Sequence, residues 1–148
     1  WITAEFQSIP SSVLEPNTYD VVISSYALHH LNANEKRSLL TRVVHAIKDG
    51  GWLLNADLVI AATAGIETRM QEIRVSSVTS RAPEGDERFR DVVATRQYLD
   101  DLEAAEYDQP QRLDTDLRII RESGLPGAEV FWKEYREVVI GGTKSNLR

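Results

Sequence analysis

Two adjacent histidines, His29 and His30, are the side chains of this sequence best suited to acid–base chemistry at neutral pH. An imidazole titrates near pH ~6.5 in water, so either residue could accept a proton from a hydroxyl or an amine. Adjacent histidines can also bind metal, but no second histidine at helical spacing and no cysteine or carboxylate cluster accompanies them. We therefore predict no metal site and take His30 as a candidate general base, with a hydrogen-bonded structural histidine as the alternative.

The elements that must position these histidines form a strand–helix–strand unit. Residues 19–24 are a β-branched run without alternation, as expected for a strand covered on both faces. In residues 34–49 the apolar positions recur at helical spacing, and Gly50 and Gly51 are expected to end the helix. Residues 52–56 form a second apolar run. This order predicts a parallel sheet, whose ligands bind beyond the carboxyl ends of its strands.

The rest of the chain adds elements around this unit. Residues 1–6 are predicted to form a brief strand, and residues 62–113 a helical insertion that acts as a cap. Residues 115–123 read as a further helix. Residues 128–135 and 137–143 are rich in β-branched and aromatic residues and predict a closely connected antiparallel pair. The predicted fold class is α/β.

Composition bounds the kind of protein that this is. A chain of 148 residues, 42% of them hydrophobic, is enough for a single domain over residues 1–148. It has no cysteine, which is compatible with a cytoplasmic location. A formal net charge of -6 gives no support for nucleic-acid binding, and no apolar stretch reaches the ~20 residues of a membrane-spanning helix. Because the chain starts at Trp1 and its single methionine is Met70, we expect that sequence upstream is missing.

The strongest motif lies in residues 19–31, which read Tyr-Asp-Val-Val-Ile-Ser-Ser-Tyr-Ala-Leu-His-His-Leu. Together with the following helix, residues 48–51 and the next strand, this block resembles the fourth strand, helix and fifth strand of class I S-adenosylmethionine-dependent methyltransferases. One departure is Asp49, where proline is common in the family. The end of the chain, closing at residues 141–144, resembles the family's final hairpin. The resemblance implies a partial Rossmann-like methyltransferase sheet, the C-terminal portion of such a domain.

The resemblance also implies which residues face the ligands. The acid of the pair Glu5 and Phe6 matches a family position that accepts a hydrogen bond from adenine, while the end of the strand at Ser24 faces the methionine portion of the cofactor. The implied cofactor-binding residues are Glu5, Phe6, Ser24, Ser25, Tyr26 and His30. The candidate substrate-binding residues are His29, Asp57 and Tyr107.

The implied activity is methyl transfer from S-adenosylmethionine to a small-molecule nucleophile, or to transfer RNA, in the intact protein. The sequence contains no G-x-G, the glycine-rich turn that lets a backbone approach the cofactor closely. We therefore expect that a missing N-terminal half or a partner chain completes the sheet, and that the 148 residues bind cofactor weakly or not at all. The alternatives are a non-catalytic interaction module derived from the same fold and a nucleotide-dependent oxidoreductase on a similar sheet.

Overall fold

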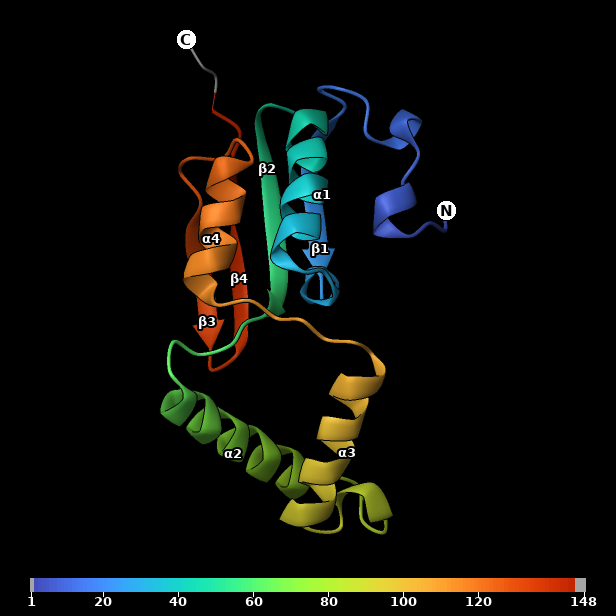
Figure 1. Ribbon diagram of the computed structural model, residues 1–148, viewed down its shortest axis with the longest axis vertical. Coiled ribbons are helices and arrows are strands. Elements are labelled where there is room, and N and C mark those ends of the chain that lie inside the picture. The colour runs from blue at the N-terminus through green and yellow to red at the C-terminus, as the bar shows by residue number, and fades with distance from the viewer. Residues whose placement is uncertain (1, 146–148) are drawn as a thin grey trace.

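The computed structural model describes residues 2–145, in which a four-stranded sheet carries two helices on one face and a pair of helices beyond one end (Figure 1). The strand order is β1-β2-β4-β3. The strands are β1 (Tyr19–Ser25), β2 (Ile47–Leu58), β3 (Glu129–Glu134) and β4 (Glu137–Thr143). β1 and β2 pair in parallel, whereas β4 pairs antiparallel with both β2 and β3. The predicted α/β class, the parallel unit and the closing hairpin are confirmed.

Helix α1 (Ala33–Ala46) connects the two parallel strands. Its start is fixed by a capping box, in which the Asn32 side chain accepts from the backbone of Glu35 and Glu35 accepts from the backbone of Asn32. The predicted end at residue 49 is wrong. Ile47 is completely buried, has an extended backbone and pairs with Tyr19, so tertiary burial ends the helix earlier than its periodicity suggests.

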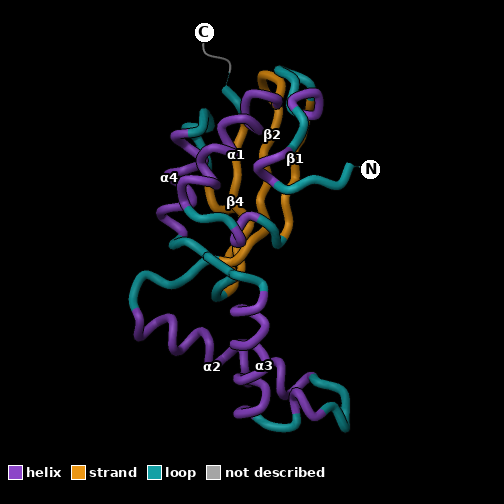
Figure 2. The backbone as a smooth tube through the Cα atoms, turned by 45° about the vertical axis from the view of Figure 1, so that its right-hand side comes forward, coloured by secondary structure: helices purple, strands orange, loops and turns teal. Residues whose placement is uncertain are grey.

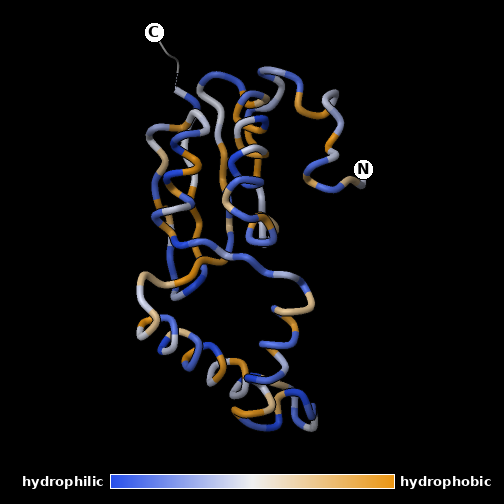
Figure 3. Tube along the Cα trace, in the orientation of Figure 1, coloured by the Kyte–Doolittle hydropathy of each residue, from blue (hydrophilic) through white to orange (hydrophobic). Residues whose placement is uncertain are grey.

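Helices α1 and α4 (Leu113–Glu122) lie on the same side of the strands (Figure 2). Their apolar faces join the inward residues of β2 and β4 in one core, which is the continuous buried apolar layer typical of α/β folds. Figure 3 shows this apolar character along the central strands. A buried polar contact joins the two helices: Lys36 Nζ donates to Asp116 Oδ1 over 2.7 Å.

The segment between β2 and α4 contains α2 (Ala64–Arg81) and α3 (Val92–Ala105), which extend beyond the end of the sheet (Figure 1). The two helices pack through Val75 and Thr95, and the Thr79 hydroxyl donates to that of Thr95. The helical character predicted for this segment is present in α2 and α3. Its definition as a cap over residues 62–113 stays a prediction.

The predicted strand at residues 1–6 is wrong for the residues that the structure describes; Trp1 lies outside them. Residues 2–5 have no regular structure and are followed by 3-10 turns at Phe6–Ser8 and Ser11–Val13. A strand needs a hydrogen-bonded neighbour, and none lies beside this segment within residues 2–145. The segment is instead held by Phe6 and Ile9, which pack against the core, and by the Arg42 guanidinium, which donates to the Ile9 carbonyl.

The other face of the sheet carries no helix within the described residues (Figure 2). Apolar side chains from three strands are exposed there, Val21 and Ile23 on β1, Trp52 on β2 and Phe131 on β3. The exposed fraction of Ile23 is 71%, and the rings of Trp52 and Phe131 lie 5.9 Å apart. β1 is also one of the two edge strands of the sheet within the described residues. Within residues 2–145 no helix is both long enough and apolar enough to cross a membrane.

Candidate functional site

The carboxyl ends of β1 and β2 lie together where the chain leaves the sheet for α2 and α3. The parallel register brings Ser25 beside Ala56, and the Tyr26 N–H donates to the Ala56 carbonyl over 2.8 Å. Tyr26 then adopts a positive φ of 47°, a left-handed conformation that is uncommon for a bulky residue. The chain therefore turns sharply after Ser25, and the following 3-10 turn, Leu28–His30, is anchored by the buried Leu28.

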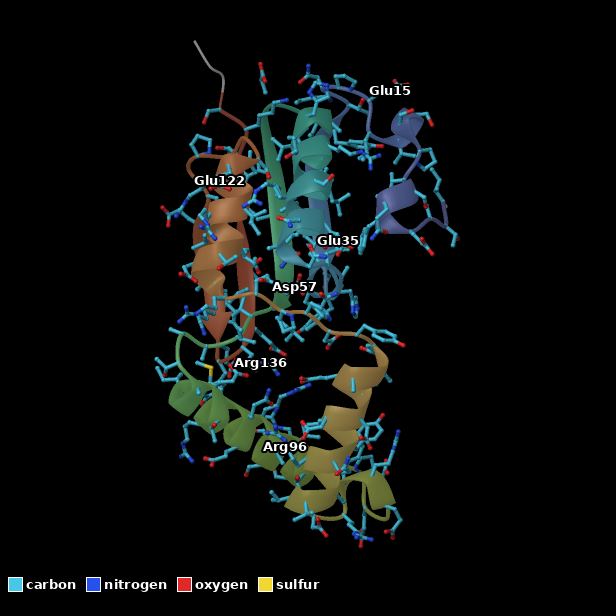
Figure 4. All side chains as sticks on the ribbon, viewed as in Figure 1. Glu15, Glu35, Asp57, Arg96, Glu122 and Arg136 are labelled. Carbon is cyan, nitrogen blue, oxygen red and sulfur yellow. The ribbon has the colours of Figure 1, made fainter. Side chains whose placement is uncertain are left out.

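The turn brings His29 against the end of β2. The Nδ1 atom of His29 lies 2.5 Å from Asp57 Oδ1, and both side chains are buried. Asp57 also accepts from the Leu58 N–H and from the Asn55 amide, so its carboxylate is held by three donors. In Figure 4 the labelled Asp57 lies at the end of the sheet that faces α2 and α3. The structure thus brings together two of the residues that the sequence assigned to the substrate.

A second acidic group, Asp108, joins this pair, and no sequence motif indicated it. Asp108, which follows α3, places Oδ1 3.3 Å from His29 Nε2 and 3.0 Å from His30 Nδ1. The Gln109 N–H donates to the His29 carbonyl over 2.7 Å, and the Gln109 side chain donates to the His30 carbonyl. The insertion is therefore fastened to the histidine turn through backbone contacts that no local motif could reveal.

The other predicted site residues occupy different surroundings. Ser24 is partly buried and Ser25 exposed, both at the carboxyl end of β1. Tyr107 precedes Asp108 but is 80% exposed and does not enter the cluster. Glu5 is exposed, and Phe6 packs against the core beside Leu31 and Leu39; no hydrogen bond among the described residues joins Glu5 or Phe6 to the Ser24–Tyr26 turn.

The Tyr26 side chain connects the turn to the hairpin. Partial burial, with the hydrogen bond and negative charge of Glu137, raises the pKa of the Tyr26 phenol. The phenol therefore stays protonated at neutral pH and remains a hydrogen-bond donor. Because Glu137 also lines a cleft between the insertion and the hairpin, Tyr26 stands between that cleft and the carboxyl end of β1.

The cleft has a volume of about 480 Å³, within the ~300–1,000 Å³ typical of small-molecule sites. One wall of the cleft is formed by apolar side chains of α2 and of the 3-10 turn Glu87–Phe89. The other wall is formed by the tip of the β3–β4 hairpin. Its apolar lining includes Leu58, Met70, Ile73, Val78 and Phe89. Such a lining suits a small molecule with apolar surface.

One arginine fixes the geometry of the cleft. Arg136, buried at the hairpin tip and labelled in Figure 4, contacts two helices of the insertion. Its Nε lies 3.2 Å from Glu67 on α2, and a terminal nitrogen donates to Glu103 on α3 over 3.0 Å. Arg74 pairs with Glu103 as well. Burial alone would raise the pKa of Glu103, but the two guanidinium groups hold it below its usual value.

Comparison with known proteins agrees with this architecture. Residues 1–55 match a family model described as a methyltransferase domain. No curated protein matches the chain. An O-methyltransferase family protein from Burkholderia thailandensis is 16% identical, with a TM-score of 0.58, over 99% of this chain and 36% of that one.

Two further solved structures have the same fold. Human N-acetylserotonin methyltransferase, solved with S-adenosylmethionine, is 16% identical with a TM-score of 0.53, over 97% of this chain and 33% of that one. A putative O-methyltransferase from Nostoc punctiforme is 14% identical with a TM-score of 0.53, over 87% of this chain and 33% of that one. The chain thus spans about a third of the length of these structures.

The chain has an open α/β sheet, and in sheets of this class ligands bind beyond the carboxyl ends of the parallel strands. The family match covers residues 1–55, which include β1, α1 and most of β2. The chain as a whole shares the fold of S-adenosylmethionine-dependent methyltransferases.

Proposed function

We propose that the whole protein transfers a methyl group from S-adenosylmethionine to a small-molecule nucleophile. The observation that carries the proposal is the continuity between the Ser24–Tyr26 turn and the cleft, which meet at Tyr26 and Glu137. A cofactor at the carboxyl end of β1 would thereby stand next to a cavity of suitable size for its acceptor.

The residues present fit one side of such a cofactor. Ser24 and Ser25 offer hydroxyls at the strand end, and the left-handed conformation of Tyr26 turns the chain sharply there. No glycine lies at this strand end: Gly141 and Gly142, for example, pack tightly against the backbone of β2 and of Ala128. Since a close backbone approach to the cofactor requires glycine, this chain contributes one wall of the binding site.

When bound, S-adenosylmethionine supplies a methyl group on a sulfonium that is already activated for displacement. The protein's contribution is then to position the acceptor in line and to exclude water, which requires neither a metal nor a covalent residue. Burial of Leu28 and His29 gives this end of the sheet a fixed shape. A proton acceptor is needed only for a protonated nucleophile, and His30, whose side chain is 36% exposed, remains the candidate predicted from the sequence.

Several features favour a small molecule over transfer RNA as the acceptor. The net charge is -6, and the arginines Arg74 and Arg136 beside the cleft are engaged by carboxylates. Phosphate binding requires uncompensated cations, so these arginines do not provide a nucleic-acid surface. The solved structures named as O-methyltransferases favour an oxygen acceptor. The lack of cysteine fits a cytoplasmic location for this activity.

The proposal includes further protein at the open side of the sheet. β1 leaves one edge unpaired, and Val21, Ile23 and Trp52 expose apolar surface beside it. Edges and apolar faces of this kind are normally covered in stable proteins. We propose that a preceding part of the same protein, or a partner chain, covers this face and adds the glycine-rich turn.

The test starts with intact mass and N-terminal sequencing of the protein from its native source. The full-length protein so defined is then assayed for S-adenosylmethionine binding by calorimetry and for transfer of labelled methyl groups. We expect binding that is weakened at least tenfold by Ser25→Trp, which fills the strand end, and unchanged by Ser12→Trp, which alters an exposed serine in the 3-10 turn Ser11–Val13.

We also expect the 148 residues alone to bind the cofactor weakly or not at all. A full-length protein that carries a glycine-rich turn but binds no S-adenosylmethionine would overturn the proposal and favour the non-catalytic interaction module.

A further inference from the structure

Three potential metal-ligand atoms converge at the histidine turn. They are His29 Nε2, His30 Nδ1 and Asp108 Oδ1, and all lie within 4.8 Å of one another. The Asp108 oxygen lies 3.3 Å from the first nitrogen and 3.0 Å from the second. Ligand atoms that surround one transition-metal ion at about 2.1 Å lie on the order of 3–4 Å apart, and both distances from Asp108 fall in that range.

Ordinary hydrogen bonding does not account for the arrangement. His29 Nδ1 is committed to Asp57, so in the neutral ring the proton is on Nδ1 and the Nε2 lone pair faces Asp108. A carboxylate oxygen is an acceptor as well, and the two lone pairs repel unless a cation or proton lies between them. Asp108 Oδ1 and His30 Nδ1 are both buried without a hydrogen-bond partner in the described part of the chain.

The buried charge of the cluster also favours a bound cation. The carboxylates of Asp57 and Asp108 are almost fully buried, with side-chain exposures of 1% and 7%, beside the two imidazole rings. A buried negative charge is costly unless a cation compensates it. No Lys or Arg pairs with either carboxylate among residues 2–145, so the cluster offers a place for a cation of its own.

We propose that His29 Nε2, His30 Nδ1 and Asp108 Oδ1 bind a divalent transition-metal ion. Two imidazoles and a carboxylate are a donor set that suits Zn²⁺, Co²⁺ or Fe²⁺ better than Mg²⁺. Three protein ligands leave open coordination positions, and the partial exposure of His30 gives solvent access to the cluster. In the metal-bound protein His30 is a ligand and not a free base.

Asp57 completes the site from behind. Ligating histidines commonly donate their second ring N–H to a carboxylate, which fixes the tautomer and orients the ring. The 2.5 Å contact between His29 Nδ1 and Asp57 Oδ1 has this geometry, and the Leu58 N–H and the Asn55 amide hold the carboxylate in turn. Asp57 is therefore a positioning residue for the ion and does not touch it.

The site joins two separate parts of the chain. The histidines follow β1, whereas Asp108 follows α3, and the Gln109 contacts hold the two segments together. Metal binding should therefore also fasten the insertion to the sheet, because an ion that binds only the folded site stabilises it by mass action.

The experiment is a metal titration of the purified, chelator-stripped protein. Co²⁺ is followed by its visible d–d absorption and Zn²⁺ by competition with a chromophoric chelator. We expect one ion per chain, with a spectrum of nitrogen and oxygen ligands. Asp108→Asn and His30→Ala should each weaken binding at least tenfold, and Asp57→Asn should weaken it about 10–100-fold through the orientation of His29.

The matched controls are His45→Ala and Asp101→Asn, an exposed histidine on α1 and an exposed carboxylate on α3. Neither should change affinity. Circular dichroism of each variant shows that it is folded, and His30→Ala is the key variant since that side chain is the most exposed of the three. Absence of binding by the wild type, or equal binding by wild type, Asp108→Asn and His30→Ala, would overturn the proposal.

Discussion

The carboxylate of Asp57 lies 2.5 Å from Nδ1 of His29, although 28 positions separate the two residues. The contact follows from the parallel register of β1 and β2, which places the carboxyl ends of both strands side by side. The turn after β1 therefore lies next to the end of β2. The contact holds the histidine turn against the end of β2.

Removal of this carboxylate should destabilise the fold. In Asp57→Ala, three donors lose their acceptor: the His29 ring, the Asn55 amide and the Leu58 N–H. Each buried donor left unsatisfied costs ~1–3 kcal/mol, so we expect a loss of at least ~2 kcal/mol in the free energy of unfolding. Denaturant unfolding measures it. Asp49→Ala, at an exposed position, is the control and should stay within ~0.5 kcal/mol; an equal effect of the two changes would contradict the assignment.

The buried ion pair between α1 and α4 should show strong coupling. Lys36→Met leaves the Asp116 carboxylate buried without its partner, which should cost ~3–5 kcal/mol at neutral pH. The double variant Lys36→Met, Asp116→Leu should recover most of that loss, because two apolar side chains of similar size replace the pair. A double-mutant cycle by denaturant unfolding measures the coupling, and additive losses would show that the pair does not act as a unit.

The same pair predicts a pH dependence with a defined sign. Burial raises the pKa of Asp116, against the lowering effect of Lys36. The folded protein therefore holds this proton more tightly than the unfolded chain, whose carboxyl titrates near its ordinary value of 3.8. This group's contribution to stability is present at low pH and falls as pH rises from that value through the raised pKa. Unfolding at stepped pH should find Lys36→Met least harmful in acid; a cost that grows toward acid would refute this.

Glu103 should give the opposite slope. Arg74 and Arg136 hold its pKa below the ordinary value of 4.5, so its contribution is present above that value and is lost as pH falls through the lowered pKa. Since Glu103 ties α3 to the hairpin, acid should loosen the insertion, which hydrogen exchange of α2 and α3 would report. Arg136→Ala should raise exchange there already at neutral pH, whereas the surface variant Glu72→Gln should not.

The sequence predicted the parts of this molecule that depend on local pattern. Apolar periodicity located α1 and both parallel strands, and with them the edge at which Ser24, His29 and Asp57 lie. It could not locate Asp108, since the contact depends on the path of the whole insertion. The end of α1 was misplaced because burial of Ile47 decides it. The strand at residues 1–6 failed for a related reason, since a strand is defined by a neighbour that local sequence does not describe.

The exposed sheet face yields the last prediction. If further protein covers it, the 148 residues alone should bind an apolar dye such as anilinonaphthalene sulfonate, and the longer protein should not.

Ile23→Lys should lower dye binding by the 148 residues and change their stability by no more than ~1 kcal/mol, because the side chain is 71% exposed and makes few contacts to lose. In the longer protein the same change should lower the free energy of unfolding several-fold more, since a buried charge replaces a buried apolar group. Val93→Lys, at an exposed position on α3, is the matched control and should affect neither form. Equal, small effects of Ile23→Lys in both forms would show that this face stays uncovered in the whole protein.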